Sequence, residues 1–100
     1  IMKIEVTRTK RVKEEIEIEF PYYYKHDLTD YDYENTCVVY GKITEKEEVT
    51  IQEKIRGNGN TIYELEKDSR SDSYFTEEYK STEQEYKEAK ERAKQFFNVL

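Results

Sequence analysis

One hundred residues are enough for a single domain, which we expect to span 1–100, and Leu, Ile, Val and Phe supply only 21 of them to its core. The formal net charge of −6 disfavours a nucleic-acid backbone as ligand and favours a basic protein surface as partner. The single cysteine excludes a disulfide framework, and with only one histidine beside it a conventional zinc site is also excluded. A membrane span is excluded because no run of about 18 apolar residues occurs. We therefore expect a cytoplasmic protein.

The first predicted strands lie within residues 2–22, where the apolar side chains keep one parity, as half-buried strands do. The members of this set are Met2, Ile4, Val6, Val12, Ile16, Ile18, Phe20 and Tyr22. One straight strand of this length would measure about 65 Å, whereas a compact domain of this size has a radius of gyration of about 13 Å. The run must therefore turn back as a hairpin or bend as one long strand with a bulge.

A hairpin with its turn centred on Arg11 would pair Ile4 with Ile18 and would set Lys3 opposite Glu19. Apolar and oppositely charged cross-strand pairs of this kind stabilise a sheet. The turn itself contains none of the residues that are usual in tight turns, which keeps the bent strand open as an alternative. We prefer the hairpin.

A long connection is predicted after Pro21, because proline lacks the backbone N–H that a strand ladder requires. Residues 22–36 mix five tyrosines with four acids and show no clear period. We expect at most one helical turn in them, near Asp27. A loop of this length in a small domain is usually functional or mobile.

Three further strands are predicted at residues 37–44, 49–56 and 61–66, with a polar tip between the first two. Their apolar side chains again keep one parity. The members of this set are Val39, Ile43, Val49, Ile51 and Ile55. The pattern indicates a meander of hairpins.

The connection before the last strand determines the register of that strand. A two-residue turn at Asn58 and Gly59 would set Ile51 opposite Glu66, whereas a three-residue loop at 57–59 would set Ile51 opposite Leu65. The longer loop also sets Glu53 opposite Tyr63 and keeps one face apolar. Register follows the buried face, so we predict the three-residue loop.

An amphipathic helix is predicted at residues 82–98, with Ser81 and Gln84 as a capping box at its start. Its apolar stripe consists of Tyr79, Tyr86, Ala89, Ala93, Phe96, Phe97 and Leu100. We expect this stripe to pack on the sheet face that bears Val39, Ile43, Ile51 and Leu65. The predicted fold is therefore α+β, an antiparallel sheet of four to five strands with one C-terminal helix packed on one face.

The most unusual feature of the sequence is a concentration of acids and tyrosines. Residues 14–36 carry a net charge of −7, whereas residues 1–13 carry +4. The side chains predicted to contact a partner are Tyr22, Tyr23, Tyr24, Asp27, Asp30, Tyr31, Asp32, Tyr33 and Glu34. Tyrosine is enriched in binding surfaces, and acids steer a basic partner. The same composition is also typical of tyrosines that compensate for a thin core.

Two acidic patterns resemble metal sites but do not fit one. The alternating glutamates of residues 15–19 lie about 6.6 Å apart on a strand and do not converge on one cation, so we interpret them as a solvated face. Asp30, Asp32 and Glu34 match the first ligands of an EF-hand loop, but the sixth position is not glycine. We expect no metal and no cofactor.

Cys37 and His26 are the only residues of the sequence that could form a nucleophile and base pair. A cysteine next to two valines on a strand is more often a small buried apolar residue, and a histidine in a polar loop is usually solvated. Nothing in the sequence supplies the third, orienting group. We therefore expect no enzymatic activity.

These patterns predict a small acidic protein-binding module, and we favour an inhibitor that occupies a basic nucleic-acid-binding surface of its partner. Small acidic proteins of phages and mobile elements, anti-CRISPR proteins among them, act in this general way, which is an analogy of style only. One alternative is a binder of single-stranded nucleic acid that uses Tyr22, Tyr23 and Tyr24 with the basic N-terminal strand. Another alternative is a structural or self-associating subunit that pairs through a strand edge.

Overall fold

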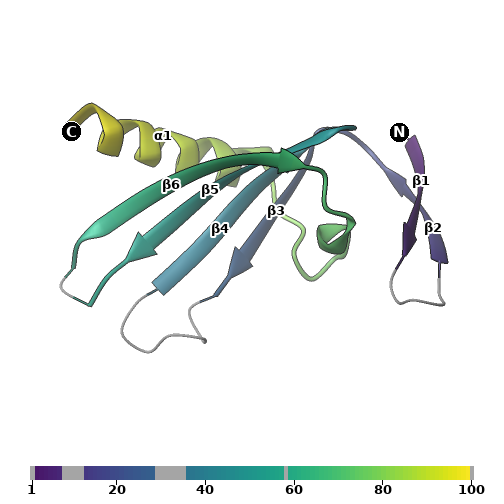
Figure 1. Cartoon of the computed structure of the whole chain (residues 1–100), viewed down its shortest axis with the longest axis horizontal. Helices are drawn as coiled ribbons and strands as arrows, with labels where there is room; N and C mark the ends of the chain where they lie inside the picture. Colours follow the sequence, from purple (N-terminus) through teal and green to yellow (C-terminus); the bar gives the residue numbers. More distant parts are fainter. Residues whose placement is uncertain (1, 8–12, 29–35, 58, 100) are drawn as a thin grey trace.

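Two antiparallel sheets and one long helix make up the described part of the chain (Figure 1). The computed structural model describes residues 2–7, 13–28, 36–57 and 59–99. The elements are β1 (Met2–Thr7), β2 (Lys13–Ile18), β3 (Tyr22–Asp27), β4 (Thr36–Ile43), β5 (Glu47–Ile55), β6 (Thr61–Ser69), the 3₁₀ helix η2 (Asp72–Tyr74) and α1 (Glu83–Val99). β1 pairs with β2, and β3 to β6 form a meander in chain order. The predicted α+β class is confirmed, with the strands divided between two sheets.

The N-terminal strands form a hairpin, but its register differs from the predicted one. β1 and β2 pair antiparallel, which rules out one long bent strand. Ile4 lies opposite Ile16 instead of Ile18, and Lys3 lies opposite Glu17. Because side chains alternate with a period of two, this two-residue displacement keeps the same face apolar and changes only which residues meet.

The prediction of a long connection after Pro21 is wrong at its beginning, because residues 22–27 form β3. β3 pairs antiparallel with β4, and Asp27 ends the strand without a helical turn. Tyr24 is buried and Lys25 is exposed, which is the alternation of a strand. Aromatic residues favour strands, but consecutive tyrosines give no apolar and polar alternation in the sequence.

The pairing of β5 with β6 follows the predicted three-residue loop. Ile51 lies opposite Leu65, and Glu53 lies opposite Tyr63. Gly59 has a φ of 86°, a left-handed conformation that glycine adopts without steric cost.

The prediction that Val39 and Ile43 share a face with Ile51 is wrong. Val39 lies opposite Gln52, and Tyr40 lies opposite Ile51. Directly opposed residues point to the same face of a sheet, so the pairing of β4 with β5 sends the odd-numbered residues of the two strands to opposite faces. Tyr40 and Ile51 therefore face the helix, and Val39 and Ile43 face away from it.

The helix begins one residue later than predicted, and a different residue caps it. Thr82 Oγ1 accepts a hydrogen bond of 3.2 Å from the Glu85 backbone N–H, which makes Thr82 the N-cap. Ser81 instead donates to the Glu85 carboxylate, and Gln84 donates to Glu88. The predicted capping box of Ser81 and Gln84 is therefore wrong, although its position in the chain was nearly right.

Small residues let α1 approach the sheet closely. Ala89 and Ala93 are 0% and 2% exposed, and they face a cluster that also contains Tyr40, Ile51, Tyr63 and Tyr86. Phe97 and Leu65, predicted to be buried here, are 43% and 55% exposed. Leu65 lies on the outer strand β6, at the margin of the surface that the helix covers.

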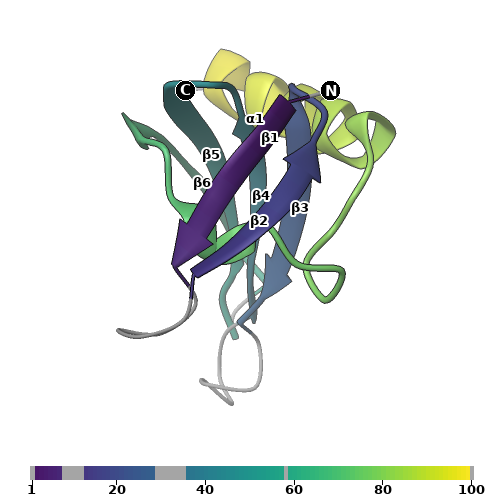
Figure 2. The same ribbon diagram turned by 90° about the vertical axis from the view of Figure 1, so that its right-hand side faces the viewer.

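A second core lies on the face of the sheet that α1 does not cover. Its buried members are Ile4, Val6, Ile18, Tyr24, Val39, Ile43 and Phe75. They come from the hairpin, the sheet and the segment between β6 and α1, which lies between the hairpin and the sheet in Figure 1. In the view of Figure 2 the hairpin stands in front of the four-stranded sheet.

The hairpin makes the molecule longer than a compact domain of its size. The radius of gyration is 15.0 Å, and the extents are 44 × 28 × 20 Å, whereas about 13 Å is expected for 100 compact residues. The hairpin and the segment after β6 lie on the two sides of a groove.

Candidate functional site

A groove of about 900 Å³ lies between β2, the start of β3 and residues 75–83. Four glutamates and one lysine line it, together with four aromatic residues. These residues are Glu17, Glu19, Glu77, Glu83, Lys80, Phe20, Tyr22, Tyr23 and Phe75. We call this feature the acidic groove.

Three carboxylates of the acidic groove are available to a ligand. Glu83 forms an ion pair of 2.9 Å with Lys87, one turn along the helix. Glu17, Glu19 and Glu77 are exposed, and within the described ranges no basic group lies within ion-pair distance of them. The groove therefore presents negative charge that the fold itself does not neutralise.

Phe75 anchors the aromatic lining of the groove. It is 3% exposed, and its ring contacts Phe20 and Tyr22 edge to face at centroid distances of 6.3 and 5.1 Å. The Arg70 guanidinium lies 5.9 Å from the centroids of both phenylalanine rings. These contacts fix the rings before any ligand arrives.

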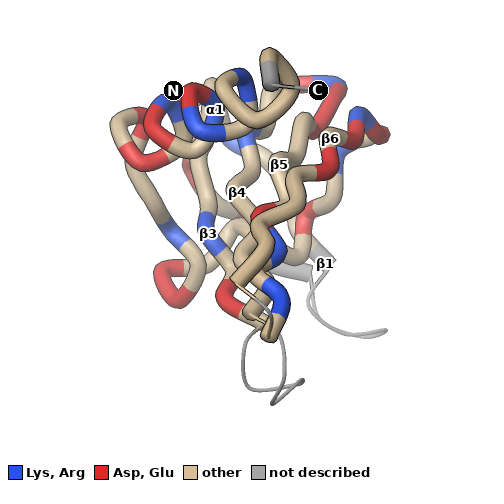
Figure 3. The backbone as a smooth tube through the Cα atoms, turned by 90° about the vertical axis from the view of Figure 1, so that its left-hand side faces the viewer, with Lys and Arg blue, Asp and Glu red and all other residues tan. Residues whose placement is uncertain are grey.

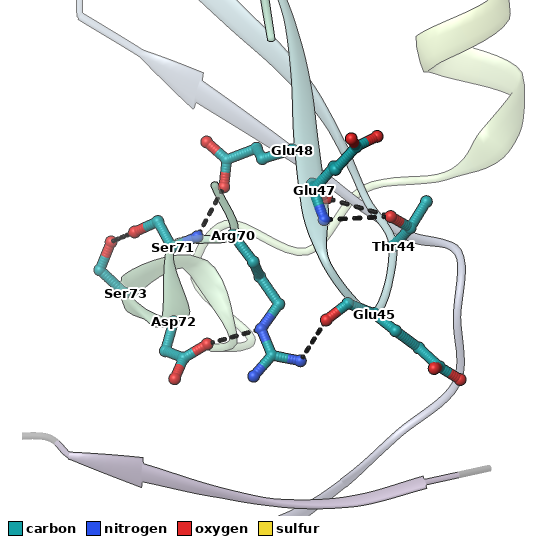
Figure 4. A network of polar contacts seen from close by, with 8 residues as sticks. All are labelled: Thr44, Glu45, Glu47, Glu48, Arg70, Ser71, Asp72 and Ser73. Atoms are coloured by element: carbon teal, nitrogen blue, oxygen red, sulfur yellow. Dashed lines mark hydrogen bonds and ion pairs between the residues drawn. The ribbon is translucent and has the colours of Figure 1, made fainter. Parts of the chain in front are cut away.

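Polar contacts attach the segment after β6 to the turn between β4 and β5 (Figure 4). The Glu48 carboxylate accepts a hydrogen bond of 3.4 Å from the Ser71 backbone N–H and one of 2.9 Å from the Tyr24 hydroxyl. Arg70 donates to the Glu45 carbonyl oxygen at 3.1 Å and forms an ion pair of 3.1 Å with Asp72. The segment after β6 carries Phe75 and forms one wall of the acidic groove. These contacts hold that wall against the sheet.

The far end of the same wall pairs with the outer edge of β3. The Lys25 backbone N–H donates to the Tyr79 carbonyl oxygen at 2.8 Å, and the Ser81 N–H donates to the Tyr23 carbonyl oxygen at 2.9 Å. Burial, followed by the charge of Glu83, raises the pKa of Tyr23. The Tyr23 phenol is therefore neutral at physiological pH and can donate a hydrogen bond.

The structure separates the residues predicted to contact a partner. Tyr22 and Tyr23 line the acidic groove. Tyr24 is 1% exposed, so its side chain lies in the core and not on the surface. Asp27 is exposed at the opposite end of β3. The remaining predicted residues, Asp30, Tyr31, Asp32, Tyr33 and Glu34, lie outside the described residues.

Sequence reasoning missed the carboxylates that complete the groove. Glu17 and Glu19 were interpreted as part of a solvated strand face, and Glu77 gave no signal. The alternation in residues 15–19 did show that these glutamates point away from the apolar side chains of β2. Only the tertiary fold brings them beside residues 75–83.

The geometry offers no support for a thiol nucleophile. Burial, as the largest cause, raises the pKa of the Cys37 thiol, which keeps it protonated and weakly nucleophilic. His26 Nδ1 lies 3.2 Å from the Tyr74 hydroxyl, and its ring contacts Tyr79. In the part of the chain that the structure describes, no group of three His, Cys, Asp or Glu side chains is arranged to hold a metal ion.

Comparison with known proteins identifies no relative. No family model matches the chain, and neither the curated proteins nor the solved structures give a match. Among the helices of the described residues, none is long and apolar enough to cross a membrane. The acidic groove has to be interpreted from its own chemistry.

Proposed function

We propose that this protein is a small acidic binding module whose groove takes a basic segment of a partner protein. The observation that carries the proposal is the set of three carboxylates, Glu17, Glu19 and Glu77, that lie beside the aromatic lining and have no ion pair with any described residue. A groove of about 900 Å³ accommodates a few extended side chains, since ligand pockets commonly measure about 300–1,000 Å³. The module acts by occupying the partner's surface and not by catalysis.

Arginine is the side chain that this groove suits best. A planar guanidinium donates two parallel hydrogen bonds to a carboxylate and also stacks on aromatic rings. Phe20 and Tyr22 supply such rings beside Glu17 and Glu19. Arg70 already shows the aromatic half of this arrangement, since its guanidinium lies over Phe20 and Phe75.

Occupying basic side chains is also a means of inhibition. A nucleic-acid-binding protein uses Lys and Arg to neutralise phosphates, so an acidic module that binds these side chains excludes the nucleic acid. We propose an inhibitor of this kind, of the type that phages and mobile elements carry. Electrostatic complementarity then accelerates association and makes the affinity depend on salt.

An arginine-rich peptide tests the proposal directly by fluorescence titration at low and at physiological salt. The triple variant Glu17→Gln, Glu19→Gln and Glu77→Gln should weaken binding at least tenfold, which is about 1.4 kcal/mol. A control with the same change in net charge replaces Glu45, Glu88 and Glu91, which are exposed outside the groove. The control should weaken binding less than threefold. Equal losses in the two variants would show that net charge, and not the groove, binds the peptide.

Binding of single-stranded nucleic acid is the weaker alternative. Tyr22 and Tyr23 lie among carboxylates that repel phosphates, and Arg8, Lys10 and Arg11 lie outside the described residues. A labelled oligonucleotide at low salt distinguishes the two functions. Micromolar binding that is lost when these three basic residues are neutralised would overturn the proposed function.

A further inference from the structure

We propose a second interaction surface at the outer edge of β6, where an extended segment of a partner adds to the sheet as an antiparallel strand. β6 is the last strand of the four-stranded sheet and contains neither proline nor glycine. Natural proteins usually protect such an edge with lysine, proline or a bulge. The one lysine of the strand, Lys67, forms an ion pair of 3.3 Å with Glu47 of the neighbouring strand β5.

The backbone of β6 presents a regular row of unpaired groups. The Arg56 N–H donates to Asn60 at one end of the ladder, and the Arg70 N–H donates to Lys46 at the other. Hydrogen-bonded pairs alternate along an antiparallel ladder, so the even-numbered residues of β6 direct their N–H and C=O groups toward β5. The outward-directed groups belong to Thr61, Tyr63, Leu65, Lys67 and Ser69. Among the described residues, these groups have no partner.

The side chains along this edge define the chemistry of the segment that would pair with it. Glu64, Glu66 and Asp68 are exposed on the face opposite α1, and within the described part of the chain only Glu64 is paired, with Lys54 at 3.1 Å. Figure 3 shows acidic positions along the tube at β6. Leu65, which is 55% exposed, lies on the other face. The complementary strand therefore alternates basic and apolar residues.

A second copy of this chain fits the edge poorly. In a symmetric antiparallel pair of β6 strands, setting Leu65 opposite Leu65 also sets Glu64 opposite Glu66. Moving the centre by one residue in either direction sets Glu64 opposite Glu64, or Glu66 opposite Glu66. Like charges directly opposite each other destabilise a sheet. Charge complementarity therefore favours a basic partner strand over self-association.

Hydrogen exchange measured by NMR, with a peptide that alternates arginine and valine and has the length of β6, tests this surface. In the free protein the amides of Glu64 and Glu66 should exchange slowly, and those of Tyr63 and Leu65 should exchange fast. The peptide should slow the second pair at least tenfold, because their N–H groups then donate to the added strand. Unchanged exchange of these amides at saturating peptide would overturn the proposal.

Two matched peptides separate strand pairing from simple charge attraction. In the antiparallel arrangement the valines lie opposite Leu65, so methylation of their backbone nitrogens should abolish binding. The same number of methyl groups on the arginine nitrogens, which point away from β6, should leave the affinity within about threefold. Equal affinity of the two peptides, or no binding of either parent or methylated peptide, contradicts the inference.

Two protein variants locate the peptide on the molecule. The variant Glu66→Gln with Asp68→Asn should weaken the peptide-induced protection of the Leu65 amide at least fivefold. The control Glu88→Gln with Glu91→Gln makes the same change in net charge at exposed positions of α1 and should change that protection less than twofold. Equal losses in the two variants would show that net charge, and not the β6 edge, attracts the peptide, and would overturn this inference without harming the proposed function. Protection of the Leu65 amide that rises with protein concentration alone would assign the edge to a second copy and would likewise overturn it.

Discussion

Tyr24 contacts residues of three other elements, η2, β4 and β5. One face of its ring stacks on Tyr74 at a centroid distance of 3.9 Å and an interplanar angle of 4°. Gly41 lies directly opposite Tyr24 in the β3–β4 ladder, and the Tyr24 ring occupies the space that a Cβ at Gly41 would need. The hydroxyl donates to Glu48, a carboxylate that is only 8% exposed. One side chain thus connects β3 with β4, with the start of β5 and with the segment after β6 that carries Phe75.

Replacing Gly41 by alanine should destabilise the fold by about 2–3 kcal/mol, because the added methyl group would overlap the Tyr24 ring atoms Cε1 and Cζ. The free energy of unfolding, measured by urea titration, checks this value. In a Tyr24→Leu background the ring is absent, so the same substitution should cost less than about 1 kcal/mol. A cost within about 0.5 kcal/mol in the native background, as at a surface site, would show that the ring does not lie against Gly41.

At the scale of single elements, the sequence predicts those features that depend on local periodicity and on the residues of a turn. The helix, the hairpin meander and the pairing of Ile51 with Leu65 follow from local patterns. Which face each strand presents did not follow, because one residue of register between β4 and β5 reverses the face of Val39. β3 was missed because tyrosine is compatible with both a buried and an exposed position, so three in a row carry no period.

The helix contributes mainly through Tyr86, and not equally through each aromatic residue of its stripe. Tyr86 is 7% exposed and lies beside Tyr23 at a ring distance of 5.5 Å, whereas Phe97 is 43% exposed. Tyr86→Ala should therefore cost about 3–5 kcal/mol, and Phe97→Ala should cost less than about 1 kcal/mol. Denaturant titration of the two variants checks the difference. Equal costs would mean that the helix is rotated about its axis relative to the sheet.

Phe96 is half-buried, so we expect its replacement by alanine to cost an intermediate amount of stability. Its ring lies 5.4 Å from that of Tyr63 and is partly covered by the sheet. We expect Phe96→Ala to destabilise the fold less than Tyr86→Ala and more than Phe97→Ala, which ranks three positions of one helix by their burial.

For the whole molecule, the candidate site could be predicted only in part, because it is assembled from segments far apart in the chain. The concentration of acids and tyrosines in the sequence pointed to one wall of the acidic groove, which contains Tyr22 and Tyr23. The opposite wall, with Phe75 and Glu77, depends on how the segment after β6 returns across the sheet. No local pattern encodes that return, since it is fixed by contacts such as that of Glu48 with Ser71.

Tyrosines buried in both cores make the whole fold sensitive to alkaline pH. Burial, as the largest cause, raises the pKa of Tyr24 above its ordinary value of 10.0, and the charge of Glu48 raises it further. Burial likewise raises the pKa values of Tyr63, Tyr74 and Tyr86. Below the ordinary pKa both the folded and the unfolded chain keep these protons. Above it the unfolded chain releases them first, so stability is complete below about pH 10 and falls as the pH rises.

Tyr24 alone should contribute a loss of about 1.4 kcal/mol per pH unit above about pH 10. The variant Tyr24→Phe should be less stable than the native chain at neutral pH by about 1–3 kcal/mol, because the buried Glu48 loses a donor. That difference should shrink by about 1 kcal/mol between about pH 10 and about pH 11, since the variant has no phenol to ionise at this position. Urea titrations of both proteins across this range measure it. A difference that stays constant with pH would show that the phenol of Tyr24 reaches solvent in the folded protein.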